Sequence, residues 1–232
     1  MILSELIAAT ILRATGKVSS AVQGDAKWNK ILGIANMKID DWSYEPEVDW
    51  ASLYNPAVSL GAVTATNTFA IPTDKTVPPP AVAIRVISQT YGDPIRILHT
   101  DGVSFTDYDL IPFDQLKQYS DGNYCTQILD NLVFNHTFTS NDAEFGGTIQ
   151  VPALLFPTHL SGPTDIVPVD NPGWLVAMCA AEYVRTDVTR QNQYKNLISE
   201  ANQLMGRMKD DNDSQIEYVT SEFTPLSKSW LG

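Results

Sequence analysis

The stretch that decides the fold begins at Asp170 and reads Asp-Asn-Pro-Gly-Trp-Leu-Val-Ala-Met-Cys-Ala-Ala. Its polar start can cap a helix, and Pro172 follows where the first helical turn tolerates proline. Apolar residues then share one helix face, namely Trp174, Met178 and Ala181. Beyond a charged stretch, apolar residues recur at spacings of three and four as far as Met208. This pattern predicts two helices, or one broken helix, over residues 172–209.

The N-terminal region carries the same kind of pattern. A one-sided apolar stripe ends just before Gly16 and consists of Leu3, Leu6, Ile7, Ile11 and Ala14. A second stripe follows Ser20 and consists of Val22, Trp28, Ile31, Leu32 and Ala35. Both stripes indicate amphipathic helices, so we predict a helical pair whose members pack against each other or against a third helix.

The middle of the chain changes character between residues 56 and 160. Short runs rich in β-branched and aromatic residues cover residues 63–71, 82–91, 95–99, 125–134 and 148–151. Turn residues separate these runs, among them Asn55-Pro56, Pro72-Thr73-Asp74, the triple proline at 78–80, Gly92-Asp93-Pro94, Asp101-Gly102 and Gly146-Gly147. The pattern predicts an antiparallel β domain of five or more strands, and the triple proline predicts a semi-rigid loop because proline cannot occupy a central strand.

These patterns together predict an α+β fold. We expect residues 1–55 and 161–209 to form a helical body into which an antiparallel β domain, residues 56–160, is inserted. Asp210, Asp211 and Asp213 interrupt the helical pattern, so residues 210–232 are predicted to form an extended acidic C-terminal arm. Such insertions are tolerated where two chain ends meet in space.

The charge of the chain excludes one class of function. The chain contains 15 Lys and Arg and 27 Asp and Glu, which gives a net charge of −12. Residues 41–160 carry −10 and residues 210–232 carry −4, whereas residues 1–40 carry +2 and residues 161–209 are neutral. A surface of this sign repels nucleic acid and anionic membrane, and no run approaches the roughly 18 apolar residues of a membrane span. We expect neither generic nucleic-acid binding nor a membrane partner.

The search for catalytic chemistry finds no known motif. Nucleophile elbows, phosphate-binding loops, zinc-protease motifs and cysteine-protease signatures are all missing from the sequence. His99, His136 and His159 are far apart, and Cys125 and Cys179 are interpreted as buried apolar residues. Acidic clusters at 107–109 and 210–213 lack the spacing of a calcium loop. We therefore expect no enzyme, no cofactor and no metal.

The aromatic residues between 42 and 54 offer a different possibility. Trp42, Tyr44, Trp50 and Tyr54 could form a sugar-binding platform, but large rings also bury well where two domains meet. We predict that the four rings seal the junction between the helical body and the β domain.

Two stretches resemble a known family. Residues 167–187, Val-Pro-Val-Asp-Asn-Pro-Gly-Trp-Leu-Val-Ala-Met-Cys-Ala-Ala-Glu-Tyr-Val-Arg-Thr-Asp, continue to a second helical segment at 194–208, and residues 63–72 read Val-Thr-Ala-Thr-Asn-Thr-Phe-Ala-Ile-Pro. With the N-terminal helix pair and Trp42, this order of elements resembles the head-to-tail adaptor (connector) proteins of tailed double-stranded DNA bacteriophages. The resemblance covers most of the chain as a pattern of composition and element order.

This resemblance implies a structural role. Adaptors of this kind form rings, commonly of twelve copies, that dock beneath the portal protein, meet a downstream tail or nozzle protein and leave a channel for DNA that is not bound sequence-specifically. The resemblance places the protein in the virion neck, and in the host cytoplasm during assembly.

The same resemblance suggests roles for two regions. A terminal arm often grips the portal, so Phe223, Leu226 and Trp230 are predicted to anchor residues 210–232 to the portal or to a neighbouring subunit, with the arm mobile before assembly. Carboxylates of residues 41–160 are predicted to line or rim the channel.

Two alternatives remain open. Another phage tail or neck component, such as a tail-completion, decoration or baseplate protein, would differ in the neighbour that it contacts. An enzyme or carbohydrate-binding module would require histidines or carboxylates that converge in one concave pocket.

Overall fold

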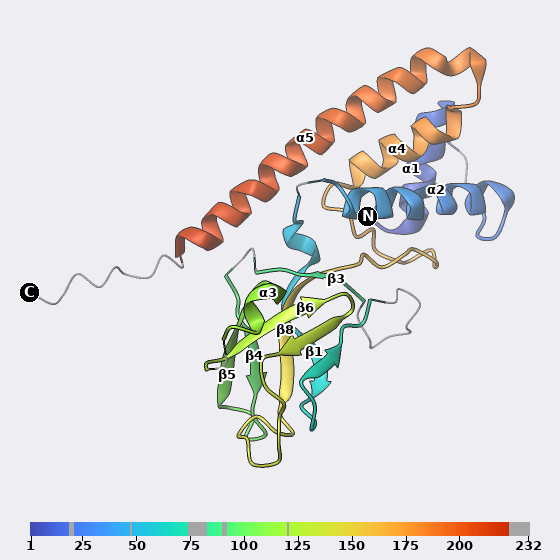
Figure 1. Ribbon diagram of the computed structural model, residues 1–232. Helices are drawn as coiled ribbons and strands as arrows, with labels where there is room; N and C mark the ends of the chain where they lie inside the picture. Colours follow the sequence, from blue (N-terminus) through green and yellow to red (C-terminus); the bar gives the residue numbers. More distant parts are fainter. Residues whose placement is uncertain (19–20, 47, 74–82, 90–91, 120, 223–232) are drawn as a thin grey trace, which may run out of the picture. The chain divides into compact units, whose positions relative to one another are not determined.

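The computed structural model describes residues 1–232 except 19–20, 47, 74–82, 90–91, 120 and 223–232, and gives the backbone alone for 216–222. The chain divides into two compact units. Met1–Ser52 and Pro157–Tyr218 form a helical unit, and the sheet of the β unit lies within Leu53–Phe156 (Figure 1). The predicted triple-proline loop lies outside the described residues.

Four helices build the helical unit: α1 (Leu3–Thr15), α2 (Ala26–Ser43), α4 (Pro172–Val184) and α5 (Gln191–Glu222). Two short 3₁₀ turns accompany them, at Ala51–Leu53 and Val188–Arg190. The predicted stripe of α1 is confirmed, because its five apolar residues are all buried. Gly16 ends α1 with a φ of 69°, a conformation that glycine adopts without steric cost. None of the described helices is long and apolar enough to cross a lipid bilayer.

Helix α4 is the central helix of this unit. The Asn171 side chain accepts a hydrogen bond from the Gly173 N–H at 3.0 Å, and Pro172 occupies the first helical position, as predicted. Eight of its 13 residues are buried. Helices α1 and α2 both pack against it, so a helix from the other end of the chain covers both N-terminal helices. Trp28, Ile31 and Ala35 of the predicted second stripe are buried, but Val22 was wrongly included, because it precedes α2 and is exposed.

The β unit contains eight strands: β1 (Tyr54–Ala62), β2 (Thr68–Ala70), β3 (Ile84–Ile87), β4 (Ile95–Leu98), β5 (Phe105–Leu110), β6 (Tyr124–Ile128), β7 (Asn131–Phe134) and β8 (Thr148–Leu155). A short helix, α3 (Phe113–Leu116), follows β5. The strands pair in the order β1-β8-β4-β5-β6-β7-β2. Strand β3 also pairs with β8, at residues 153–155, whereas β4 pairs with β8 at residues 148–150. The sheet curls into a half-barrel (Figure 1).

The predicted antiparallel β domain is wrong, because the sheet is mixed. Strands β5 and β6 run parallel, with Asp109 opposite Tyr124 and Leu110 opposite Cys125. Parallel neighbours need a crossover of about a dozen residues, and residues 111–123, which include α3, provide it. The residue composition indicated a strand at 125–134 but none at β5, and it held no information on strand direction.

The predicted extended arm is also wrong over its first half. Helix α5 continues through residues 210–213 and ends at Glu222. Asn212 is buried, and its side chain accepts a hydrogen bond from the Ala51 N–H at 2.8 Å and donates one to the Asp49 carbonyl at 3.0 Å. Extending a helix that has already formed requires little further ordering per bond. This local anchoring, which the acidic composition concealed, accounts for the longer helix.

The β unit encloses its own core. Phe134 lies at its centre, with ring centroids 4.8 Å from Tyr108, 5.2 Å from Phe138 and 5.7 Å from Phe69, all packed edge to face. Apolar side chains of β3, β4 and β8 complete this core. The aromatic contacts join strands that are distant in sequence, so the half-barrel is held by tertiary packing.

Candidate interaction surfaces

The predicted anchors Phe223, Leu226 and Trp230 lie outside the described residues. The candidate sites that the structure places are therefore surfaces of the two units.

The first surface is one end of the helical unit, where the C-terminal ends of α1 and α4 meet the starts of α2 and α5. The Arg190 guanidinium donates a hydrogen bond to the Ala14 carbonyl, and the Gln193 amide donates one to the Arg13 carbonyl at 2.7 Å. The Lys30 ammonium lies 4.6 Å from the centre of the Tyr183 ring. These contacts bring together residues from both ends of the sequence.

This surface carries many cations, and we call it the basic end. Seven of the 15 Lys and Arg belong to it: Arg13, Lys17, Lys27, Lys30, Arg185, Arg190 and Lys195. Four carboxylates accompany them: Asp25, Glu182, Asp187 and Glu200. The sequence does not predict this surface, because its cations come from two segments that are neutral or nearly neutral in total charge. The sequence signal for this surface was the cluster of Arg185, Arg190 and Lys195 in and around the turn at Val188–Arg190.

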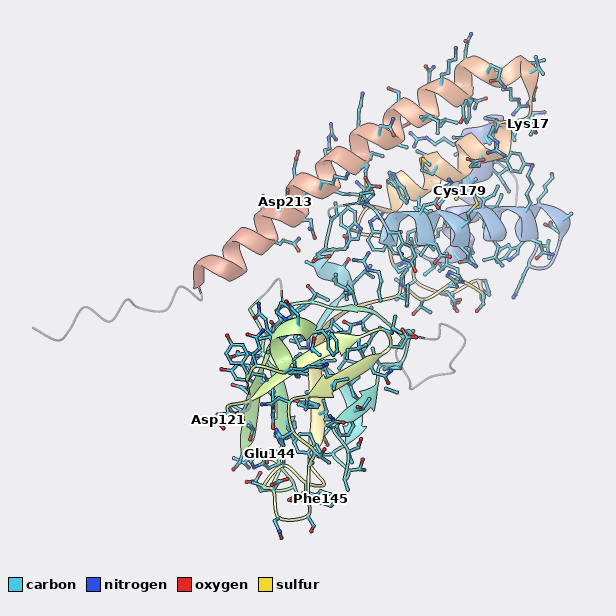
Figure 2. The ribbon with its side chains drawn as sticks, viewed as in Figure 1. Lys17, Asp121, Glu144, Phe145, Cys179 and Asp213 are labelled. Atoms are coloured by element: carbon cyan, nitrogen blue, oxygen red, sulfur yellow. The ribbon has the colours of Figure 1, made fainter. Side chains whose placement is uncertain are left out.

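Several charges of the basic end are already occupied locally. Arg13 pairs with Glu200 at 2.7 Å, Arg185 with Glu182 at 3.1 Å and Arg190 with Asp187 at 3.1 Å. At the start of α2 the Asp25 carboxylate accepts a hydrogen bond from the Trp28 N–H, and this bond lowers the pKa of the Asp25 carboxyl. Among the described residues, Lys17, Lys27 and Lys195 form no ion pair, and all three are exposed. They give the surface its available positive charge (Figure 2 labels Lys17).

Apolar side chains accompany these cations. Val18 is 91% exposed and Val188 is 84% exposed, in the turns that follow α1 and α4. Val22 and Leu12 are exposed close by in the chain. Exposed apolar groups rimmed by charge are typical of protein interaction sites.

The second surface lies on the outer side of strand β5. Alternate residues of a strand point to opposite faces, and β5 buries Tyr108 while it exposes Phe105, Asp107 and Asp109. The Arg96 guanidinium lies 4.5 Å from the Phe105 ring centre and pairs with Asp107 at 3.3 Å. Strand β5 was missed in the sequence because Asp107 and Asp109 made it look like an acidic turn.

The segment after β5 extends this surface. Phe113 is 51% exposed and Tyr119 is 43% exposed, and both alternate along the chain with exposed Asp114 and Asp121. The Asp109 N–H donates to the Asn123 carbonyl at 3.0 Å, which brings the end of this segment beside β5 (Figure 2 labels Asp121). We call the set Phe105, Asp107, Asp109, Phe113, Asp114, Tyr119 and Asp121 the acidic face. Its Asp109, Asp114 and Asp121 form no ion pair among the described residues.

The three histidines lie in separate places. His99 shares a hydrogen bond of 2.8 Å with the Thr106 hydroxyl, which donates to Glu144 at 2.9 Å. His136 stacks on Tyr108 in the β unit, and His159 lies 3.0 Å from Asp40 in the helical unit. Within the described ranges, no three His, Cys, Asp or Glu side chains are arranged to hold a metal ion.

Both cysteines are buried, as predicted, and are free thiols. Burial raises the pKa of Cys125 to about 12 and that of Cys179 to about 12. Neither thiol is therefore ionised near neutral pH, which makes both poor nucleophiles.

The predicted aromatic cluster is divided between the two units. Trp42 and Trp50 stack with ring centroids 5.3 Å apart inside the helical unit, and the Trp50 indole donates to the Trp42 carbonyl at 2.8 Å. Tyr54 belongs to β1, where its hydroxyl donates to Asp93 at 2.6 Å. Trp42 and Trp50 are fully buried, so neither exposes a ring face to a sugar, and the sealing of the junction by the four rings stays a prediction.

A polar pocket of about 310 Å³ opens in the helical unit, lined by Asp170, Asn171, Met208, Asp211, Asn212 and Gln215. Burial raises the pKa of Asp170, and a hydrogen bond to Ser52 opposes that shift. Among the described residues, the pocket lining includes two carboxylates, Asp170 and Asp211, and no cation or histidine.

No protein family model and no curated protein sequence matches this chain.

Proposed function

We propose that the protein is a structural virion component that forms a ring between the portal and the tail and leaves a channel for DNA. The single observation that best supports this role is the pair of exposed surfaces, one basic with aliphatic side chains and one acidic with aromatic side chains. Surfaces of this composition suit assembly with other proteins. The resemblance of residues 63–72 and 167–208 to phage adaptors supplies the kind of assembly.

The proposed partners follow from this role. The ring contains copies of the same chain, commonly twelve in the adaptor family, and it contacts the portal on one side and a downstream tail or nozzle protein on the other. The virion neck is the proposed location, with assembly in the host cytoplasm.

The acidity of the chain supports the passage of DNA. A wall of carboxylates releases no counterions from DNA and so does not retain it. The described part of the β unit carries nine carboxylates against three Lys and Arg, and carboxylates within residues 41–160 are proposed to line or rim the channel.

The test is electron microscopy of the purified protein mixed with portal rings from the same virus. A second ring stacked on the portal, absent from portal alone and from the protein alone, is the expected result. Portal rings without added density, beside unbound monomers, would contradict the adaptor role. Density on isolated tails in place of portals would assign the protein to another tail component.

A further inference from the structure

We propose that the basic end of one copy binds the acidic face of the next copy. This contact rests on the proposed ring for its biological setting, but it is argued from charge and exposure alone. It names the surfaces through which the subunits meet.

The available charges on the two surfaces are complementary. Lys17, Lys27 and Lys195 are exposed and form no ion pair with a described carboxylate, although Lys27 lies close enough to Asp25 to lower the pKa of that carboxyl. On the acidic face, Asp109, Asp114 and Asp121 present carboxylates without a described cation partner. Opposite potentials across an interface speed encounter and fix the register of the partners.

The apolar groups are complementary as well. Val18 and Val188 on the basic end are almost fully exposed, and Phe105, Phe113 and Tyr119 on the acidic face are about half exposed. Aromatic rings accept both aliphatic contacts and lysine ammonium groups. The chain already uses this pairing internally, where Lys117 lies 5.5 Å from the Phe113 ring centre.

The two surfaces are different, so the contact joins unlike faces. Two basic ends repel each other, and so do two acidic faces, which disfavours any contact between like surfaces. A contact between unlike faces repeats from copy to copy and closes into a ring when the rotation permits. A second copy therefore fits the basic end better than DNA does, because DNA must approach a chain of net charge −12.

The test uses two full-length charge-reversal variants. The basic-end variant carries Lys17→Glu, Lys27→Glu and Lys195→Glu. The acidic-face variant carries Asp109→Lys, Asp114→Lys and Asp121→Lys. All six side chains are exposed, so both variants are expected to fold, which circular dichroism checks. A control with the same charge change elsewhere carries Asp130→Lys, Asp210→Lys and Asp213→Lys, all exposed.

Sedimentation velocity measures self-association at about 50 mM and about 500 mM salt, because screening weakens a charge contact. The wild type is expected to associate more strongly at low salt than at high salt. Each variant alone is expected to have an association constant at least about tenfold lower than that of the wild type. A one-to-one mixture of the two variants restores association, since each surface then meets its opposite. The control variant keeps both surfaces, so it is expected to associate as strongly as the wild type, which separates loss of the contact from the change in net charge.

Several results would overturn the proposal. They are a wild type that stays monomeric at low salt, association that neither variant changes, and a mixture that fails to restore it. Labelled duplex DNA that the wild type binds and the basic-end variant releases, with self-association unchanged, would assign the basic end to nucleic acid instead.

Repeating the mixtures with portal rings separates this proposal from the proposed function. Normal rings on the portal from both variants would leave the adaptor role intact and reject the contact. Restored association in the mixture, without any wild-type ring on the portal, would retain the contact and reject the adaptor role.

Discussion

The helical unit and the β unit build their cores from differently arranged segments of the chain. The helical unit joins two segments that are separated by the whole β unit, and α4 covers stripes from the other end of the sequence. The β unit is one continuous segment whose core is centred on aromatic rings. Their available charges are also opposite, positive at the basic end and negative on the acidic face. Each unit therefore has its own core, and the proposed contact between copies uses one surface from each unit.

The largest effect is expected in the β core. Phe134→Ala removes a buried ring that contacts three other aromatic side chains, and this should destabilise the β unit by about 3–5 kcal/mol. Phe105→Ala, at a half-exposed position on the same sheet, should have a much smaller effect. Urea unfolding followed by near-ultraviolet circular dichroism measures both. Equal losses from the two variants would show that the aromatic cluster is not the core.

A smaller effect is expected in the helical unit at Asn212. Asn212→Ala removes the side chain's hydrogen bonds with the Ala51 N–H and the Asp49 carbonyl, which should cost about 1–3 kcal/mol and reduce the helix content of α5. The neighbouring Asp213→Ala changes an exposed side chain and should be nearly neutral. Far-ultraviolet circular dichroism during unfolding compares them. If Asn212→Ala is as stable as the wild type, residues 210–222 are not anchored through this side chain.

A stabilising change is expected at the turn between β6 and β7. Leu129 has a φ of 51° and is 86% exposed, so it is strained and buries little. Leu129→Gly should stabilise the β unit by about 0.5–1 kcal/mol, since glycine adopts this backbone freely. Asp130→Gly, at a residue without positive φ, should not stabilise. The urea midpoints of the two variants test this prediction. An unchanged or lower midpoint for Leu129→Gly would show that the backbone at Leu129 is not strained.

The smallest effect concerns pH at Asp170 in the helical unit. Its pKa is raised by burial, so the folded state favours the protonated carboxyl, and stability falls as pH rises through the folded pKa. Asp170→Asn has no such loss and still accepts a hydrogen bond from Ser52. The variant should melt above the wild type at neutral pH, and the difference should vanish below the ordinary value of 3.8. A constant difference across this range would exclude the linkage.

The sequence predicted some elements well because their signals are local. The stripe of α1 and the Asn171-Pro172 start of α4 follow from helical periodicity and capping, which neighbouring residues determine. Strand β1 was missed because Asn55-Pro56 looked like a turn. Among the strands that the structure describes, β1 pairs with β8 alone, and its register is irregular between Asn55 and Val58. Proline is tolerated at such edges and bulges.

The candidate surfaces could be predicted only in part. The acidity of the middle segment was visible, but the alternation that exposes Asp107 and Asp109 depends on β5 being a strand. The basic end depends on the tertiary contact between Arg190 and the end of α1. Summing charge along the chain cannot detect a surface that folding assembles from two segments.

The central claim is that the two oppositely charged surfaces meet between copies. The most direct measurement is zero-length carbodiimide cross-linking of an equal mixture of unlabelled and isotope-labelled protein, followed by mass spectrometry of the peptides. Links that join Lys17, Lys27 or Lys195 to Asp109, Asp114 or Asp121 are predicted, and each should occur in the mixed labelled–unlabelled form as well as in the two single-isotope forms. Links of these residues that occur only in single-isotope forms, or the absence of these pairs among the links between copies, would contradict the account.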